Sequence, residues 1–205
     1  MDKKARRTHA ERSAETKDKI IQAVVELISE QGIQKTTANA IAKRAGVTWG
    51  ALQHHFGGKY GALAATLEDS FERFSQTIGE PSAETKPLTL RIDQFIERAW
   101  EHYRSPHFKS MFALLSNDLS EIYEAAEWKH EQMRLFESLD SVWLTFFPRE
   151  LKDDHLRKTV AHYTHSVLTG LAMTHNTWIT GKQTAHRELA LLKKSLLEVI
   201  SEKSP

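Results

Sequence analysis

The sequence predicts an all-α protein with an N-terminal head of three helices and a larger helical domain behind it. Two observations carry this prediction. The 205 residues are 40% hydrophobic and 27% charged with only nine glycines and five prolines, which suits one or two compact, largely helical domains. Apolar residues also recur at helical spacing along most of the chain, and no stretch reads as a run of strands.

Composition narrows the class of protein further. No apolar run approaches the roughly 20 residues that a membrane-spanning helix needs, and the charged start lacks the apolar core of a signal peptide. We therefore expect a soluble, cytoplasmic protein without a membrane partner. The chain has no cysteine, which excludes disulfides, thiolate metal ligands and cysteine nucleophiles.

Charge is unevenly distributed along the chain. Residues 1–60 hold 11 Lys and Arg against 6 Asp and Glu, whereas the remaining residues hold 17 against 21. The positive N-terminal part favours a polyanionic partner. Basic side chains are concentrated at the very start, so residues 1–15 are interpreted as a flexible basic arm, although a solubilising tail would have the same composition.

The first helix is expected from about Thr16, where a regular apolar stripe begins. The stripe consists of Ile20, Val24, Leu27 and Ile28. Gly32 should end the helix, because glycine readily takes the left-handed conformation that closes a last turn. Ile33 can then fold back onto that turn.

Two short helices follow, separated by a glycine turn. Thr36 and Thr37 can both cap the first of them, and Gly46 ends it after barely three turns. Thr48 is a suitable N-cap for the next helix, whose inner edge includes Leu52. Each helix is too short to be stable alone, so both must pack on the first helix. This is the outline of a helix-turn-helix.

The outer face of the third helix carries groups that can read bases. With Leu52 and Phe56 pointing inward, a rotation of about 100° per residue turns Gly50, Gln53 and His54 outward. The amide of Gln53 can pair with adenine, and His54 can donate to a guanine acceptor or to a phosphate. Gly50 allows the helix to approach the major groove closely.

Other side chains of this region suit the DNA backbone. Thr37, Thr48, His55 and Lys59 lie where phosphate contacts would fix the register, and Trp49 can stack on a sugar or touch a thymine methyl group. An alternative is that Trp49 and His55 only complete the small core of the head. The full set of expected DNA contacts is Thr37, Thr48, Trp49, Gly50, Gln53, His54, His55 and Lys59.

Residues 16–63 resemble the DNA-binding domain of the TetR family of transcriptional regulators. The likeness lies in TTANAIAKRAGVTWGALQHHFGGK, residues 36–59, through its threonine pair, its IA-x-x-AGV segment, the Thr48-x-Gly50 opening and the closing His-Phe and Lys59. The sequence departs from the family at Gln53, where Tyr is usual, and at Tyr60-Gly61, where an acidic residue is common.

The resemblance implies a domain organisation and a function. Residues 16–60 would form the helix-turn-helix head, and residues 61–205 a larger helical regulatory and dimerisation domain. The implied function is that of a ligand-responsive regulator, most often a repressor, released from double-stranded operator DNA by an apolar or aromatic small molecule. The alternatives are a DNA-binding regulator without small-molecule control and a His-dependent metal-binding enzyme.

The larger domain also reads as helical. The stripe of Leu63, Leu67, Phe71 and Phe74 extends to about Ile78, and residues 79–88 form the clearest loop because they hold two prolines and a glycine. Apolar spacing then predicts helices at about 88–104, 106–117, 119–147, 150–180 and 184–202.

Aromatic residues are frequent in these helices, and most should be ordinary core. A subset can line the effector site that the resemblance implies. The candidates are Phe71, Trp100, Phe112, Trp128 and His165.

A metal site or catalytic site is not expected. His162 and His165 share a helical face and can hold a divalent metal, but the sequence places no strong carboxylate partner beside them. Ser166 lies next to these histidines, yet neither a nucleophile elbow nor a phosphate-binding glycine loop is present. The prediction is therefore no metal, no cofactor, no catalytic residue and no enzyme.

The last helix predicts self-association. Its stripe, widened by Leu191 and Leu197, exceeds what one surface helix needs, so a second chain should cover the excess. We expect a two-fold homodimer in which helices 150–180 and 184–202 form a four-helix interface, with recognition helices about 34 Å apart. The expected interface residues are Leu189, Leu192, Leu196, Val199 and Ile200.

Overall fold

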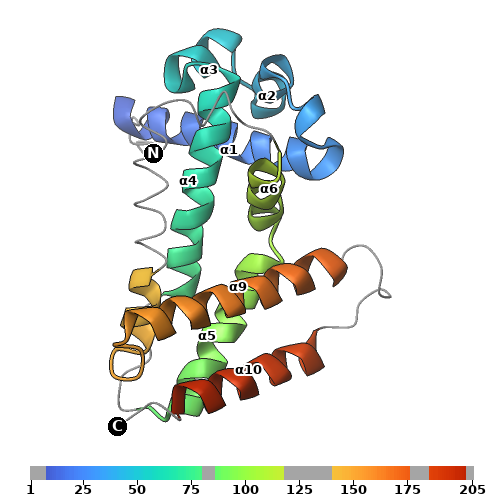
Figure 1. Cartoon of the computed structure of the whole chain (residues 1–205). Coiled ribbons are helices and arrows are strands. Elements are labelled where there is room, and N and C mark those ends of the chain that lie inside the picture. The colour runs from blue at the N-terminus through green and yellow to red at the C-terminus, as the bar shows by residue number, and fades with distance from the viewer. Residues whose placement is uncertain (1–7, 80–85, 118–139, 176–184, 202–205) are drawn as a thin grey trace, which may run out of the picture. The chain divides into compact units, whose positions relative to one another are not determined.

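The computed structural model describes residues 8–79, 86–117, 140–175 and 185–201. All regular structure within these ranges is helical, which confirms the all-α prediction (Figure 1). These residues form two compact units, the first made of 8–70 and 106–117 and the second of 71–79, 86–105, 140–175 and 185–201. No helix in the described part of the chain has both the length and the apolar character that a bilayer crossing requires.

In the first unit, helix α1 spans His9–Gln31 and begins earlier than Thr16. The Thr8 hydroxyl accepts a hydrogen bond from the Glu11 amide at 3.2 Å, and the Glu11 carboxylate accepts one from the Thr8 amide at 2.7 Å. This reciprocal cap stabilises the first turn, so part of the segment expected to be a flexible arm is helical. Residues 1–7 lie outside the described residues.

The glycine-bounded helices form as expected, with one correction. The α1 helix ends at Gly32, and α2 spans Ala38–Ala45 between Thr37 and a left-handed Gly46. Only Thr37 caps α2, because the buried hydroxyl of Thr36 donates instead to the carbonyl of Gly32 at 3.0 Å. Thr36 therefore ties the turn to the end of α1.

Helix α3 spans Trp49–Phe56 and α4 spans Lys59–Ile78. Helix α6, at Pro106–Leu115, packs on α1, where the buried Ser110 hydroxyl donates to the Val25 carbonyl at 3.1 Å. The first unit thus includes the first half of α4 and all of α6, whereas the sequence placed the boundary after residue 60.

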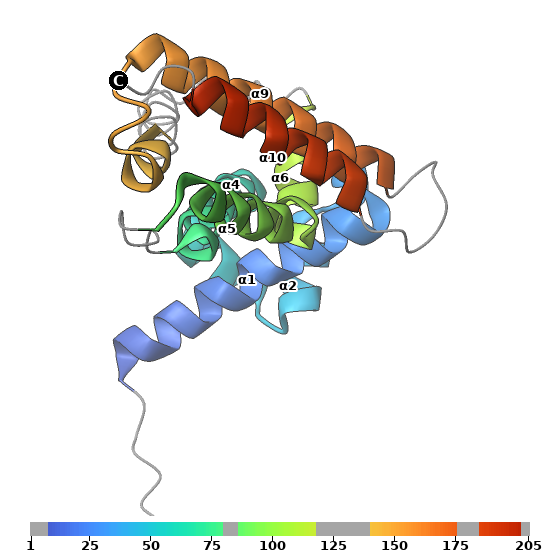
Figure 2. The same cartoon turned by 90° about the horizontal axis from the view of Figure 1, so that it is seen from below.

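The second unit contains α5 (Leu88–Tyr103), a helical segment at 140–146, α9 (Asp154–His175) and α10 (His186–Ser201). Helices α9 and α10 run side by side (Figures 1 and 2), and both contact α5. The aromatic core gathers around Phe95, whose ring centroid lies 4.4 Å from that of Trp143 and 5.2 Å from that of Phe146. Much of the helix expected at 119–147 lies outside the described residues.

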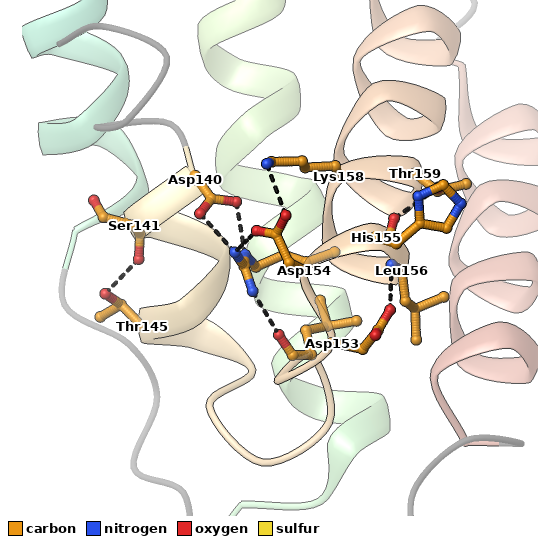
Figure 3. A network of polar contacts seen from close by, with 11 residues as sticks. Asp140, Ser141, Thr145, Asp153, Asp154, His155, Leu156, Lys158 and Thr159 are labelled. Atoms are coloured by element: carbon orange, nitrogen blue, oxygen red, sulfur yellow. Dashed lines mark hydrogen bonds and ion pairs between the residues drawn. The ribbon is translucent and has the colours of Figure 1, made fainter. Parts of the chain in front are cut away.

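The buried side chain of Arg157 in α9 holds the preceding segment, residues 140–153, by hydrogen bonds. Arg157 donates to both carboxylate oxygens of Asp140, at 2.6 and 2.8 Å, and to the Leu151 carbonyl at 3.2 Å (Figure 3). Asp153 caps α9 by accepting the Leu156 amide at 2.7 Å, so this helix starts at Asp154 rather than near residue 150. The hydrogen bonds that Arg157 donates to Asp140 raise the pKa of Arg157 despite its burial.

Candidate nucleic-acid interface

The site is built by α2, the Gly46 turn and α3 in the first unit. Leu52 of α3 and Ile41 of α2 are fully buried, which fixes the inner faces of both helices. The opposite side of α3 is therefore presented to solvent (Figure 1). Thr48, Trp49, Gly50, Gln53 and His54 are all exposed.

Trp49 is 56% exposed, so it does not complete the core of the head. An exposed indole at the first position of α3 can stack on a sugar or contact a thymine methyl group. The exposure argues against a purely structural role for Trp49, and its DNA contact stays a prediction.

The capping threonines keep a free donor. The Thr48 hydroxyl accepts the Ala51 amide at 3.1 Å, and the Thr37 hydroxyl accepts the Ala40 amide at 3.2 Å. Each cap uses an oxygen lone pair, which leaves the hydroxyl hydrogen to donate to an acceptor such as a phosphate. Both side chains are exposed, as that role requires.

His55 is half-buried at the end of α3, with its ring centroid 5.1 Å from that of His54. Burial lowers the pKa of His55, and the charges of His54, Lys17 and His9 lower it further. Because Lys17 and His9 belong to α1, positive groups from two helices act on this imidazole. An anion beside the ring would reverse the effect.

Two further expected DNA-contact residues, Gln53 and Lys59, lie beside the loop between α3 and α4. The Gln53 amide oxygen lies 3.3 Å from the position that a side-chain carbon on Gly58 would take. The ammonium group of half-buried Lys59 lies 5.7 Å from the ring centroid of Tyr60, within reach of a cation–π attraction.

An ion-pair bracket holds α2 on α1. Arg44 donates to Glu30 at 2.6 and 2.9 Å and to Glu26 at 3.1 Å. The hydrogen bonds to Glu30 and Glu26 raise the pKa of Arg44, and the same contact with Arg44 lowers the pKa of Glu30. These groups are neutralised locally and are not available to a polyanion.

The candidate effector residues are divided between the two units. Phe112 is half-buried in the first unit, whereas half-buried Phe71 and Trp100 belong to the second. His165 is also in the second unit, and its Nδ1 lies 2.7 Å from the Tyr103 hydroxyl. Trp128 lies outside the described residues. The sequence interpretation missed Tyr103, because nothing in its spacing separates it from core aromatics.

Most of the stripe expected at the dimer interface is buried within its own chain. Leu189, Leu192, Leu196 and Ile200 are buried within the chain itself, where α10 packs on α5 and α9. Val199, at 42% exposed, remains available to a second chain. These apolar side chains belong to the core of their own chain, because α10 covers α5 within the second unit.

Titratable residues do not gather into a metal site within the ranges that the structure describes. No group of three or more His, Asp or Glu side chains lies close enough there to hold a metal ion. Burial lowers the pKa of His165, and the charge of His162 lowers it further.

Known proteins with a similar sequence are transcriptional regulators of the helix-turn-helix type. A family model described as bacterial regulatory proteins, tetR family, matches residues 20–66. The chain is 35% identical over 120 residues to the uncharacterised HTH-type transcriptional regulator TtgW of Pseudomonas putida, covering 58% of this chain and 78% of TtgW. It is also 35% identical over 120 residues to SrpR of Pseudomonas putida, an HTH-type transcriptional regulator, but there it spans only 49% of the relative.

A solved structure shares the fold across most of the chain. It is that of the multidrug binding protein EbrR complexed with imidazole, with a TM-score of 0.62 and 14% sequence identity. The match covers 92% of this chain and 94% of that one.

Proposed function

The chain belongs to the TetR family of DNA-binding transcriptional regulators, and from this premise we propose that it is a repressor released from its operator by a small molecule. We place it in the cytoplasm, where its DNA partner lies. The observation that carries the DNA-binding part is the exposed face of α3, where Trp49, Gln53 and His54 stand outward over the buried Leu52.

Operator recognition divides between two kinds of contact. Gln53 and His54 offer groups that can read base edges, whereas Thr37, Thr48, His55 and Lys59 supply backbone contacts. Genomic footprinting with the purified chain tests this directly. Discrete protected sites are expected, and uniform low-affinity coverage would argue against a sequence-specific regulator.

Two copies are needed to read two half-sites. The exposed apolar residues of the second unit that lie on α9 and α10 are Tyr163, Leu191 and Val199. We assign these outer faces, rather than the buried stripe, to the contact with a second chain. Such a homodimer would place its recognition helices about 34 Å apart on successive major grooves. A single protected half-site without symmetry would contradict it.

Effector control is supported by the fold and by one relative. EbrR is a multidrug binding protein that shares the fold, and α4 of this chain carries residues of both units. A ligand can act on DNA binding only through different affinities for two arrangements of the protein. A coupling of about 1–3 kcal/mol would weaken operator binding about 5- to 150-fold. By reciprocity, calorimetric titration should give weaker ligand binding when operator is present.

A further inference from the structure

The second unit contains a polar pair beside aromatic rings, in which Tyr103 is buried and His165 is exposed. The Tyr103 hydroxyl of α5 lies 2.7 Å from Nδ1 of His165 on α9, and Tyr103 is only 7% exposed. Phe74, at the end of α4, meets the buried His102 edge-on, with ring centroids 5.0 Å apart, and lies 6.3 Å from the Tyr103 ring. The hydrogen-bonded pair of Tyr103 and His165 therefore lies next to the rings of Phe74 and His102.

The protonation of this pair follows from its surroundings. Burial raises the pKa of Tyr103, while burial and the nearby His162 lower the pKa of His165, so both groups are neutral at pH 7. A phenol is a good donor and a neutral imidazole nitrogen a good acceptor, which favours the tautomer of His165 in which Tyr103 donates to Nδ1. The proton of His165 then sits on Nε2, on the far side of the ring, as an N–H donor.

A third polar group on α9 is left without a partner. Thr164 is 3% exposed, and its hydroxyl is buried with no hydrogen bond to any described residue. Thr159 and Thr174 on the same helix donate to the carbonyl four residues earlier, both at 2.8 Å. The Thr164 hydroxyl does not use that carbonyl. A buried hydroxyl without a partner is unfavourable in a protein interior, which points to a bound molecule that forms a hydrogen bond with it.

We infer that Tyr103, His165 and Thr164 form a binding site for an uncharged aromatic molecule that carries one hydrogen-bond acceptor, such as a ketone or ester carbonyl. The aromatic body suits the rings of Phe74 and His102, and the acceptor suits the N–H of His165 and the Thr164 hydroxyl. This inference rests on the proposed effector control and names the chemistry of the effector.

An uncharged ligand is favoured because the two buried arginines of this unit already form ion pairs with carboxylates. Arg91 is bonded to Glu150 and to the Phe146 carbonyl. Arg157 is bonded to Asp140 and Asp154 (Figure 3). Neither guanidinium offers an unpaired charge to a carboxylate ligand, and a buried carboxylate without a partner is strongly unfavourable.

The test uses three probes of similar size on the full chain without DNA. Acetophenone is aromatic, neutral and an acceptor; ethylbenzene lacks the acceptor; benzoate is charged. Calorimetric titration should show acetophenone binding about tenfold more tightly than either of the others, the size expected for one or two hydrogen bonds. Failure to bind acetophenone, or preference for benzoate or ethylbenzene, overturns the assignment.

Matched variants locate the site. Thr164→Val should raise the melting temperature of the free protein, since it removes an unsatisfied hydroxyl, and should weaken acetophenone binding about fivefold. Tyr103→Phe should weaken it similarly. Thr169→Val is the control, because the Thr169 hydroxyl is also buried without a partner but lies about 140° around α9 from Thr164.

The outcomes separate this inference from the proposed function. Equal effects of Thr164→Val and Thr169→Val on acetophenone binding overturn the site, even if operator binding stays intact. Operator footprinting that fails while acetophenone binds as described overturns the repressor and leaves the site standing. If Tyr103→Phe does not fold, as judged by its melting curve, the two threonine variants still decide.

Discussion

The backbone carbonyl oxygen of Phe56 lies 1.7 Å from the position that a side-chain carbon on Gly61 would occupy. This contact sets how closely the end of α3 meets the start of α4, and because the obstructing atom is backbone, no rotation of a side chain relieves it. The glycine that departs from the family pattern is thus required by this junction.

Gly61→Ala should destabilise the protein by about 1–3 kcal/mol, because the added methyl group forces the backbone apart. Gly50→Ala is the control, since its nearest neighbour would be the Thr48 hydroxyl at 3.8 Å. Alanine in an unobstructed helix should stabilise by up to about 1 kcal/mol. Urea denaturation measures both, and a stabilising Gly61→Ala would disprove the steric argument.

Lys59→Ala should weaken binding to all duplexes and reduce the salt slope by about one, because it removes the proposed phosphate contact. Gln53→Ala should mainly relax sequence preference, since we propose that its amide reads a base edge. Fluorescence anisotropy with operator and random DNA at several salt concentrations separates the two. Equal losses on both DNAs for both variants would refute this division of roles.

Operator affinity should rise as the pH falls from about 8 to about 6, by less than tenfold per unit. In the free protein the pKa of His55 is lowered by burial and by His54, Lys17 and His9, whereas a neighbouring phosphate favours the imidazolium, so binding takes up a proton. His55→Gln should flatten the profile at constant ionic strength. A flat profile in the unaltered protein would contradict the phosphate contact.

The lowered pKa of His55 has the opposite effect on folding: acid weakens the stability of the free protein, whereas it strengthens operator binding. A histidine whose folded pKa lies below its unfolded value binds protons less well when folded. Its effect on stability is therefore neutral above the unfolded pKa of about 6.5 and unfavourable as the pH falls below it. Operator binding should offset this loss, which is visible as a larger DNA-induced rise in melting temperature at low pH.

Glu150→Gln should cost about 3 kcal/mol at pH 7, because it leaves the buried Arg91 charge without its carboxylate. Burial alone would raise the pKa of Glu150, but hydrogen bonds from Arg91 and from backbone amides lower it below its ordinary value of 4.5. The stability that ionised Glu150 contributes is thus present above 4.5 and lost as the pH falls through the lower folded value.

Urea denaturation at neutral and acid pH measures this dependence. The curves of the two proteins should converge in acid, since both then lack the charge. Glu198→Gln is the control, because its contact with Lys194 is long, at 3.8 Å, and exposed, so it should change stability by less than about 1 kcal/mol. Equal costs for both variants would argue against the buried pair.

Leu191→Glu should produce a folded monomer, because Leu191 is 65% exposed on α10 and a charge there opposes burial by a second chain. Leu192→Ala, one residue away, should instead destabilise each chain by about 2–5 kcal/mol, since Leu192 is buried. Sedimentation velocity and thermal melting distinguish these effects. A Leu191→Glu protein that remains dimeric would move the interface elsewhere.

Local signals in the sequence determined the helices of the head. Gly32, Gly46 and the capping residues Thr37 and Thr48 stop and start helices through their own backbone and side-chain chemistry, which needs no distant partner. The angle of about 100° per residue then placed Gln53 and His54 outward once Leu52 was assigned inward. The start of α1 was misplaced because the Thr8–Glu11 cap precedes the first apolar residue of the stripe.

Tertiary structure alone decided which apolar or polar groups meet. Leu192 and Leu196 carry the same pattern whether their partner is α5 of their own chain or a second chain, and packing chose the former. Tyr103 and His165 are far apart in sequence, so no spacing rule could pair them. Periodicity fixes the face of a helix on which a residue lies, but what covers that face depends on how the helices fold together.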